Sequence, residues 1–292
     1  MTHPLLEFGG HGPVLLLAPA NGFPPGTYTP ILEPLTARFR VVCLPPRAMW
    51  PDVGEPPAEP GSWTTIADEL LHGMALHGLS EVVGLGHSFG SVALLLAAVR
   101  ERHRFRGLCL LDPTIPPPPL LERMRDTAEA TGRSRRMATK ARSRRAEFRD
   151  PDDAFAYWRQ KPLFADWSDD ALWLYTHSVL RPSETGSGFR LSWSPQWEAH
   201  YYESLYTGTW GDIERLDPKL PLLVIGGATS DTYSPDAAGL LQAELPQARF
   251  ETVAGYGHLF PQAAPDATRA ILEDWLRSVV PEAWTDSPNQ AR

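Results

Sequence analysis

The feature of this sequence that most constrains its fold is a five-residue turn between an apolar strand and an apolar helix. Residues 82–85 form a short, β-branched apolar run, which is typical of a buried strand. The turn Gly86-His87-Ser88-Phe89-Gly90 follows it, and residues 92–99 then form a wholly apolar helix. Glycines at both ends of the turn keep side chains out of a crowded corner, so Ser88 can adopt a strained backbone. A strand that leads directly into a buried helix indicates an α/β domain.

Other parts of the chain repeat this alternation of strand and helix. Apolar runs that look like buried strands alternate with helical patterns, at residues 13–18, 39–44, 105–111, 220–225 and 249–254. Such alternation predicts a mostly parallel, doubly wound sheet with ligands at the carboxyl ends of its strands. Ser88 stands at one of these ends.

A long central region interrupts the alternation. It opens on four prolines, at positions 116 to 119, and carries no further run of the buried-strand type. Residues 155–210 hold 14 of the chain's 29 aromatic residues. We therefore predict an α/β core made of residues 1–115 and 216–292, with a mainly helical, aromatic-rich cap inserted at residues 116–215.

A basic run lies within this central region. Residues 133–149 carry eight Lys or Arg side chains and one acidic side chain, although the whole chain has a formal net charge of −8. The charges are spaced around the whole circumference of a helix, so we interpret them as a solvated helix face. A site for an acidic substrate is the alternative interpretation. The acidic net charge argues against a nucleic-acid partner.

Composition narrows the class of protein further. No apolar run approaches the roughly 20 residues of a membrane span, and the N-terminus carries no secretory signal. Cys43 and Cys109 lie in apolar strand-like runs, which indicates buried free thiols and fits a cytoplasmic location. The chain has no metal-ligand spacing and no G-x-G-x-x-G after a strand, so we expect neither metal nor cofactor. Nothing in the sequence bears on the oligomeric state.

Ser88 has candidate chemical partners at other strand ends. Asp231 and His258 each follow a later strand-like run. A serine hydroxyl needs a base to take its proton, a histidine can do so, and a carboxylate holds the histidine in the useful tautomer. We therefore predict Ser88 as nucleophile, Asp231 as acid and His258 as base. Asp112, at the end of another strand-like run, is the alternative acid, and the turn alone would also fit a merely capping serine.

With this turn and the order Ser88, Asp231, His258, the chain resembles the α/β-hydrolases. The Gly-Gly-x-x-Ser-Asp turn at residues 226–231 and the pair Gly257-His258 add to the resemblance, which covers residues 13 to about 280. It implies the α/β-hydrolase fold, with a cap inserted after the strand that follows the turn.

The resemblance also implies an oxyanion hole made of two backbone N–H groups, from Phe89 and Phe23. Similar hydrolases often carry His-Gly-x-Pro at the second donor, where this chain has Asn21-Gly22-Phe23-Pro24. A backbone donor does not depend on the replaced histidine side chain. The support of the loop, however, must differ here.

Residues and resemblance together predict a cofactor-free serine hydrolase that cleaves a carboxylic ester through an acyl-enzyme. Dehalogenases and epoxide hydrolases normally use aspartate as nucleophile, so Ser88 argues against both. A mostly apolar small-molecule substrate would bind under the cap, and the candidate residues for this are Asn21, Trp158, Trp193, Trp197 and Tyr201. The alternatives are a C–C bond hydrolase or perhydrolase of the same fold, and a ligand-binding receptor on a hydrolase scaffold.

Overall fold

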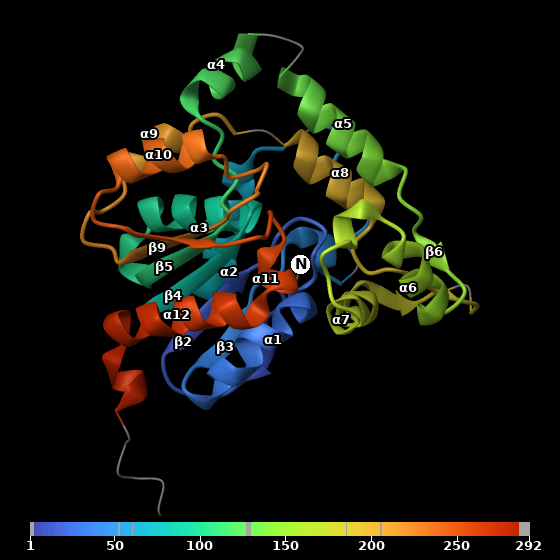
Figure 1. Cartoon of the computed structure of the whole chain (residues 1–292), viewed down its shortest axis with the longest axis horizontal. Helices are drawn as coiled ribbons and strands as arrows, with labels where there is room; N and C mark the ends of the chain where they lie inside the picture. The colour runs from blue at the N-terminus through green and yellow to red at the C-terminus, as the bar shows by residue number, and fades with distance from the viewer. Residues whose placement is uncertain are drawn as a thin grey trace, which may run out of the picture.

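A seven-stranded sheet forms the centre of the molecule (Figure 1). The computed structural model describes residues 3–285, apart from residues 52, 60, 127–129, 185 and 205. Across the sheet, the strands are β1 (Leu6–Gly9), β3 (Arg40–Cys43), β2 (Val14–Ala18), β4 (Val82–His87), β5 (Phe105–Leu111), β9 (Leu222–Gly227) and β10 (Arg249–Val253). All neighbours are parallel except the edge pair β1 and β3. The predicted mostly parallel, doubly wound sheet is confirmed.

Helices cover both faces of this sheet because its strands are apolar on both sides. In β2, Leu16 points into one buried cluster while Leu15 and Leu17 point into the other. The first cluster packs under α2 (Trp63–Leu76), α3 (Phe89–Arg100), α9 (Thr209–Ile213) and α10 (Pro235–Glu244). The second packs under α1 (Thr29–Leu32), α11 (Phe260–Ala263) and α12 (Pro265–Val279).

Residues 116–215, called the inserted region below, connect β5 to β9 and carry most of their structure beside the sheet (Figure 1). Their helices are α4 (Pro118–Asp126), α5 (Ala130–Arg142), α6 (Pro151–Arg159), α7 (Asp169–Val179), α8 (Pro195–Glu203) and α9. They also form a small antiparallel sheet of β6 (Glu147–Phe148), β8 (Phe189–Leu191) and β7 (Leu180–Pro182). The sequence indicated no strand here, because strands of two or three residues are too short to show alternation.

The basic run is not a single helix. Helix α5 ends at Arg142, so Arg144, Arg145 and Arg149 follow it in a different segment. The basic side chains on the helix are exposed, which fits the interpretation as a solvated face. Arg144 is different, because it is partly buried and pairs with Glu198 of α8.

Both cysteines are buried within the sheet as free thiols, as predicted. In the part of the chain that the structure describes, no helix is both long and apolar enough to cross a membrane.

Candidate active site

Ser88 lies in the sharp turn between β4 and α3, with φ 58° and ψ −121°. A Cβ at Gly86 would lie 2.5 Å from the Cα of Ser91, and one at Gly90 would lie 2.2 Å from the carbonyl oxygen of Ala18. Both contacts are impossible, so only glycine fits at either position. The glycines therefore allow a turn that holds Ser88 in a conformation rare for non-glycine residues.

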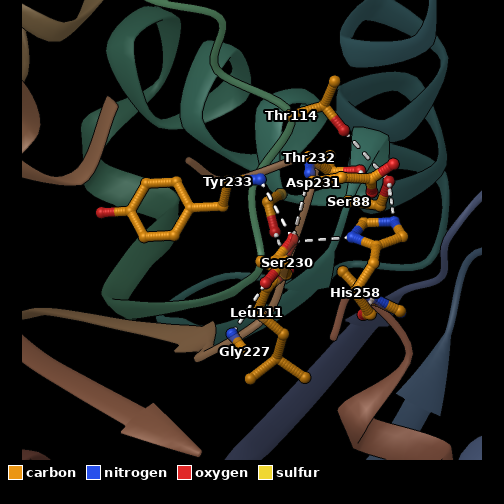
Figure 2. A network of polar contacts seen from close by, with 12 residues as sticks. Ser88, Leu111, Thr114, Gly227, Ser230, Asp231, Thr232, Tyr233 and His258 are labelled. Atoms are coloured by element: carbon orange, nitrogen blue, oxygen red, sulfur yellow. Dashed lines mark hydrogen bonds and ion pairs between the residues drawn. The ribbon is translucent and has the colours of Figure 1, made fainter. Parts of the chain in front are cut away.

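Ser88 is one end of a continuous line of hydrogen bonds (Figure 2). Its Oγ lies 3.0 Å from Nε2 of His258. Nδ1 of the same ring lies 2.7 Å from Oδ1 of Asp112. His258 comes from the loop between β10 and α11, and Asp112 directly follows β5. A carboxylate only accepts hydrogen bonds, so Nδ1 carries the proton and Nε2 is free to accept one from Ser88.

Asp112 is fully buried, and protein groups donate several hydrogen bonds to its carboxylate. Its carboxylate accepts hydrogen bonds from the backbone N–H of Gly227 at 2.8 Å and from the hydroxyl of Ser230 at 2.6 Å. Burial alone would raise the pKa of Asp112, but the hydrogen bonds from His258, Gly227 and Ser230 outweigh it and hold the pKa below its usual value. The carboxylate is therefore charged and fixed in place beside His258.

The predicted pairing of Asp231 with His258 is wrong. The Asp231 side chain is 82% exposed, and its carboxylate pairs with Arg133 of α5 at 3.2 Å. After β9 the chain turns so that Ser230 points inward, where its Oγ also accepts the N–H groups of Thr232 and Tyr233. This turn directs the next side chain, that of Asp231, to solvent. The alternative acid, Asp112, occupies the position beside the imidazole.

Thr114 also contacts Ser88, although sequence reasoning did not single it out. Its Oγ1 lies 3.0 Å from Ser88 Oγ (Figure 2), and its N–H donates to the Ser88 carbonyl oxygen at 3.4 Å. Thr114 stands just before the four prolines that open the central region. A lone threonine at such a position carries no sequence signal of a site.

Comparison with known proteins places the chain in a family. The model of the alpha/beta hydrolase family matches residues 14–271. The chain belongs to that family. No curated protein matches the sequence itself.

Several solved structures of other proteins share the fold. E-2-(acetamidomethylene)succinate hydrolase superposes with a TM-score of 0.77 at 17% identity, covering 93% of this chain and 94% of that one. A thermophilic esterase from Thermogutta terrifontis gives 0.66 at 22% identity, with 94% and 93% covered. MenH from S. aureus gives 0.68 at 17% identity, with 96% and 99% covered. At such identities the likeness concerns the fold alone.

The two backbone donors expected of this alpha/beta hydrolase differ in their surroundings. Phe89 is the first residue of α3, where a backbone N–H has no acceptor within the helix. The N–H of Phe23 instead lies 3.1 Å from the carbonyl oxygen of Ala20 in a tight turn, with Gly22 at φ 77°. To bind an oxyanion, the Phe23 N–H must share or release that hydrogen bond.

Asn21, which stands where similar hydrolases often have histidine, ties this loop to the inserted region. Its side-chain amide donates to the backbone carbonyl of Glu198 in α8 at 3.0 Å. The Glu198 carboxylate and Arg144 lie directly against Gly22. Support for the loop thus comes partly from outside the core.

His87 links the same loop to His258. The N–H of Ala20 donates to the hydroxyl of Tyr28 at 3.0 Å, and that hydroxyl lies 2.8 Å from Nδ1 of His87. Nε2 of His87 lies 3.0 Å from the carbonyl oxygen of His258, and it must donate there because a carbonyl only accepts. Burial lowers the pKa of His87 to about 3, so the ring is a neutral bridge.

The aromatic candidates fall into two groups. The rings of Tyr201 and Trp193 lie 5.3 and 6.5 Å from that of Phe89, and Trp197 lies 5.6 Å from Tyr201. Trp158 instead packs at 5.0 Å against Tyr175, inside the aromatic core of the inserted region. Trp193, Trp197 and Tyr201 therefore pack with Phe89, the residue after Ser88, in one buried cluster, whereas Trp158 packs in a different one.

No group of three or more His, Cys, Asp or Glu side chains among the described residues is arranged to hold a metal ion.

Proposed function

We propose that this alpha/beta hydrolase is a serine esterase that cleaves a carboxylic ester through an acyl-enzyme. The observation that supports this proposal is the hydrogen-bonded line from Ser88 through His258 to Asp112, held on a strained turn. Asp112 replaces Asp231 as the acid in this mechanism. The line joins a nucleophile, a base and an orienting carboxylate in the geometry that acyl transfer requires.

In acylation, Ser88 Oγ attacks the ester carbonyl carbon while its proton moves to Nε2 of His258. The charged Asp112 stabilises the resulting imidazolium through Nδ1. The carbonyl oxygen becomes an oxyanion, for which the N–H groups of Phe89 and Phe23 are the proposed donors. His258 then protonates the alcohol as the C–O bond to the leaving group breaks.

In the proposed reaction the inserted region acts as the cap over the site. Its residues Trp193, Trp197 and Tyr201 pack around Phe89 and would offer an apolar wall to the substrate. The partly buried Arg144 lies against Gly22 in the Phe23 loop, and its charge is already compensated by Glu198 and by a hydrogen bond to Tyr175. A neutral, mostly apolar acyl or aryl group suits this site because it needs no further counter-ion.

A panel of p-nitrophenyl esters of graded acyl length tests the function, with Ser88→Ala as control. We expect turnover of the native protein and loss of many powers of ten in the variant. An organophosphonate should add once, on the peptide that contains Ser88. Turnover unchanged in Ser88→Ala would refute the proposal, and ligand-induced thermal shifts without any turnover would favour the receptor alternative.

A further inference from the structure

The loop after β5 supplies two groups to the site. Asp112 lies beside His258, and two residues later Thr114 lies beside Ser88. The loop is held in place directly after the threonine. The next residue, Ile115, is fully buried and donates its N–H to Pro113 O at 2.9 Å, while the indole N–H of Trp210 holds Pro116 O at 2.8 Å. The position of Thr114 is therefore a fixed part of the fold.

The direction of the hydrogen bond between the two hydroxyls follows from the rest of the line. Nδ1 of His258 donates to Asp112, so Nε2 is an acceptor and takes the hydrogen of Ser88 Oγ. Ser88 has only one hydroxyl hydrogen. In the 3.0 Å contact between Ser88 Oγ and Thr114 Oγ1, the Thr114 hydroxyl must therefore be the donor and Ser88 Oγ the acceptor.

We propose that Thr114 is a catalytic residue that stabilises Ser88 Oγ as this atom leaves the acyl group during deacylation. The inference rests on the proposed esterase function. It assigns to the Thr114 hydroxyl a hydrogen bond that is weak in the acyl-enzyme and strong in the transition state that follows.

The chemistry of that step is as follows. Water adds to the acyl carbon and gives one proton to Nε2 of His258, which leaves a tetrahedral intermediate. The bond between this carbon and Ser88 Oγ then breaks, and its electron pair goes to Oγ. The imidazolium returns its proton to Oγ, and the carboxylic acid departs. Negative charge grows on Oγ while the bond breaks, within reach of the Thr114 hydroxyl.

The same hydroxyl has a smaller effect on acylation. In the free enzyme Ser88 Oγ already accepts the hydrogen bond of Thr114, so the bond exists before and during the attack. In the acyl-enzyme Oγ is an ester oxygen, which is a poor acceptor, and the bond regains strength only as charge develops. Only interactions that are stronger in the transition state than in the ground state accelerate a step.

Three variants test the role. Thr114→Val keeps the shape and removes the hydroxyl, and Thr114→Ser keeps the hydroxyl. Ser91→Ala is the matched control. Ser91 lies in the first turn of α3, close to Ser88 in sequence, but its hydroxyl donates at 3.3 Å to the Leu111 carbonyl and not to Ser88. Rapid quenching followed by intact mass measurement gives the fraction of acyl-enzyme during steady-state turnover of a p-nitrophenyl ester.

We expect Thr114→Val to slow deacylation roughly ten- to a hundredfold, the range for a hydrogen bond to a charged group. The acyl-enzyme fraction should rise, and kcat and KM should fall together so that kcat/KM changes little. Thr114→Ser should restore the native fraction, and Ser91→Ala should match the native protein.

An unchanged acyl-enzyme fraction in Thr114→Val would overturn the inference, as would equal losses in kcat and kcat/KM. Failure of the esterase proposal itself is distinguishable. In that case the native protein would show neither acyl-enzyme nor organophosphonate adduct at Ser88, whatever residue 114 is.

Discussion

Two neighbouring strands, β5 and β9, are each followed by an aspartate, and the two carboxylates have opposite surroundings. Asp112 after β5 is fully buried and accepts hydrogen bonds from His258, Gly227 and Ser230. Asp231 after β9 is exposed and pairs with Arg133. The difference arises within a few residues of backbone, because the turn after β9 uses Ser230 as its inward-pointing residue. The end of a strand brings an aspartate near the active site, but the local turn determines whether its carboxylate points towards His258 or towards solvent.

The largest expected effect comes from exchanging each aspartate for asparagine. In Asp112→Asn the amide at position 112 would favour the wrong tautomer of His258, a change that costs about 10⁴ in kcat in a serine protease. Asp231→Asn should stay within about twofold of the native activity, since the carboxylate touches no reacting group. The measurement is kcat/KM on one activated ester, with near-UV circular dichroism to show that both variants are folded. Reversal of the two effects would restore Asp231 as the acid.

The next effect concerns the pH dependence of stability that arises from His87, which is fully buried like Asp112. The pKa of His87 is about 3 in the folded protein against 6.5 for an ordinary histidine. Between these values the unfolded state binds a proton that the folded state does not, so stability falls as the pH falls from 6.5 towards 3. At pH 5 this amounts to about 2 kcal/mol relative to pH 7. His3, whose pKa is lowered to about 4 mainly by burial, adds a loss of the same sign.

His87→Gln tests this prediction, since glutamine can still donate to the His258 carbonyl but does not titrate. Urea unfolding at pH 7 and pH 5 should show a smaller acid loss in the variant than in the native protein, by about 2 kcal/mol. Equal losses in both proteins would mean that His87 is accessible to water and protons. His3→Gln serves as the parallel variant for the second buried ring.

A smaller effect is expected at Ser230, which directly precedes Asp231 and donates a hydrogen bond to Asp112. Ser230→Ala removes one of the three hydrogen bonds to the Asp112 carboxylate. The backbone N–H of Gly227 and the ring N–H of His258 remain as donors. We expect a loss of about 1 to 2 kcal/mol in the free energy of unfolding and a fall of up to tenfold in kcat/KM. Activity retained at the native level would show that His258 and Gly227 alone hold the carboxylate. Ser234→Ala, at the N-cap of α10, is a control that costs stability without touching Asp112.

These contrasts explain how far the sequence alone reaches. The sheet and the positions of Ser88 and His258 follow from local patterns: apolar runs, glycines that a sharp turn requires, and a histidine after the last strand. Asp112 and Asp231 both satisfy the same pattern, and only the backbone after each strand distinguishes them. Thr114 acts through a contact with Ser88 that spans 26 residues of sequence, and neither composition nor spacing encodes such a contact. The sequence likewise does not distinguish Trp158 from Trp193, although Trp158 packs in the core of the inserted region and Trp193 packs in a different buried cluster beside Phe89.

The smallest effect is expected where the exposed aspartate meets the inserted region. Arg133 contacts both the carboxylate and the backbone carbonyl of Asp231, and so connects α5 with the loop after β9. The two side chains are 53% and 82% exposed, and an exposed ion pair contributes only about 0 to 1 kcal/mol because water and salt screen it. Arg133→Ala should therefore change the unfolding midpoint very little.

The same variant sharpens the comparison between the two aspartates. If the Arg133 contact has no effect on the active site, Arg133→Ala and Asp231→Asn should each leave kcat/KM unchanged. Their small effects on the free energy of unfolding should then add in the double variant. If it instead holds the inserted region over Ser88, both single variants should raise KM to the same extent, and the double variant should match either one. The exposure of both partners favours the first outcome. A shared rise in KM that is no larger in the double variant than in either single variant would give Asp231 a role in closing the site, although it is not the acid.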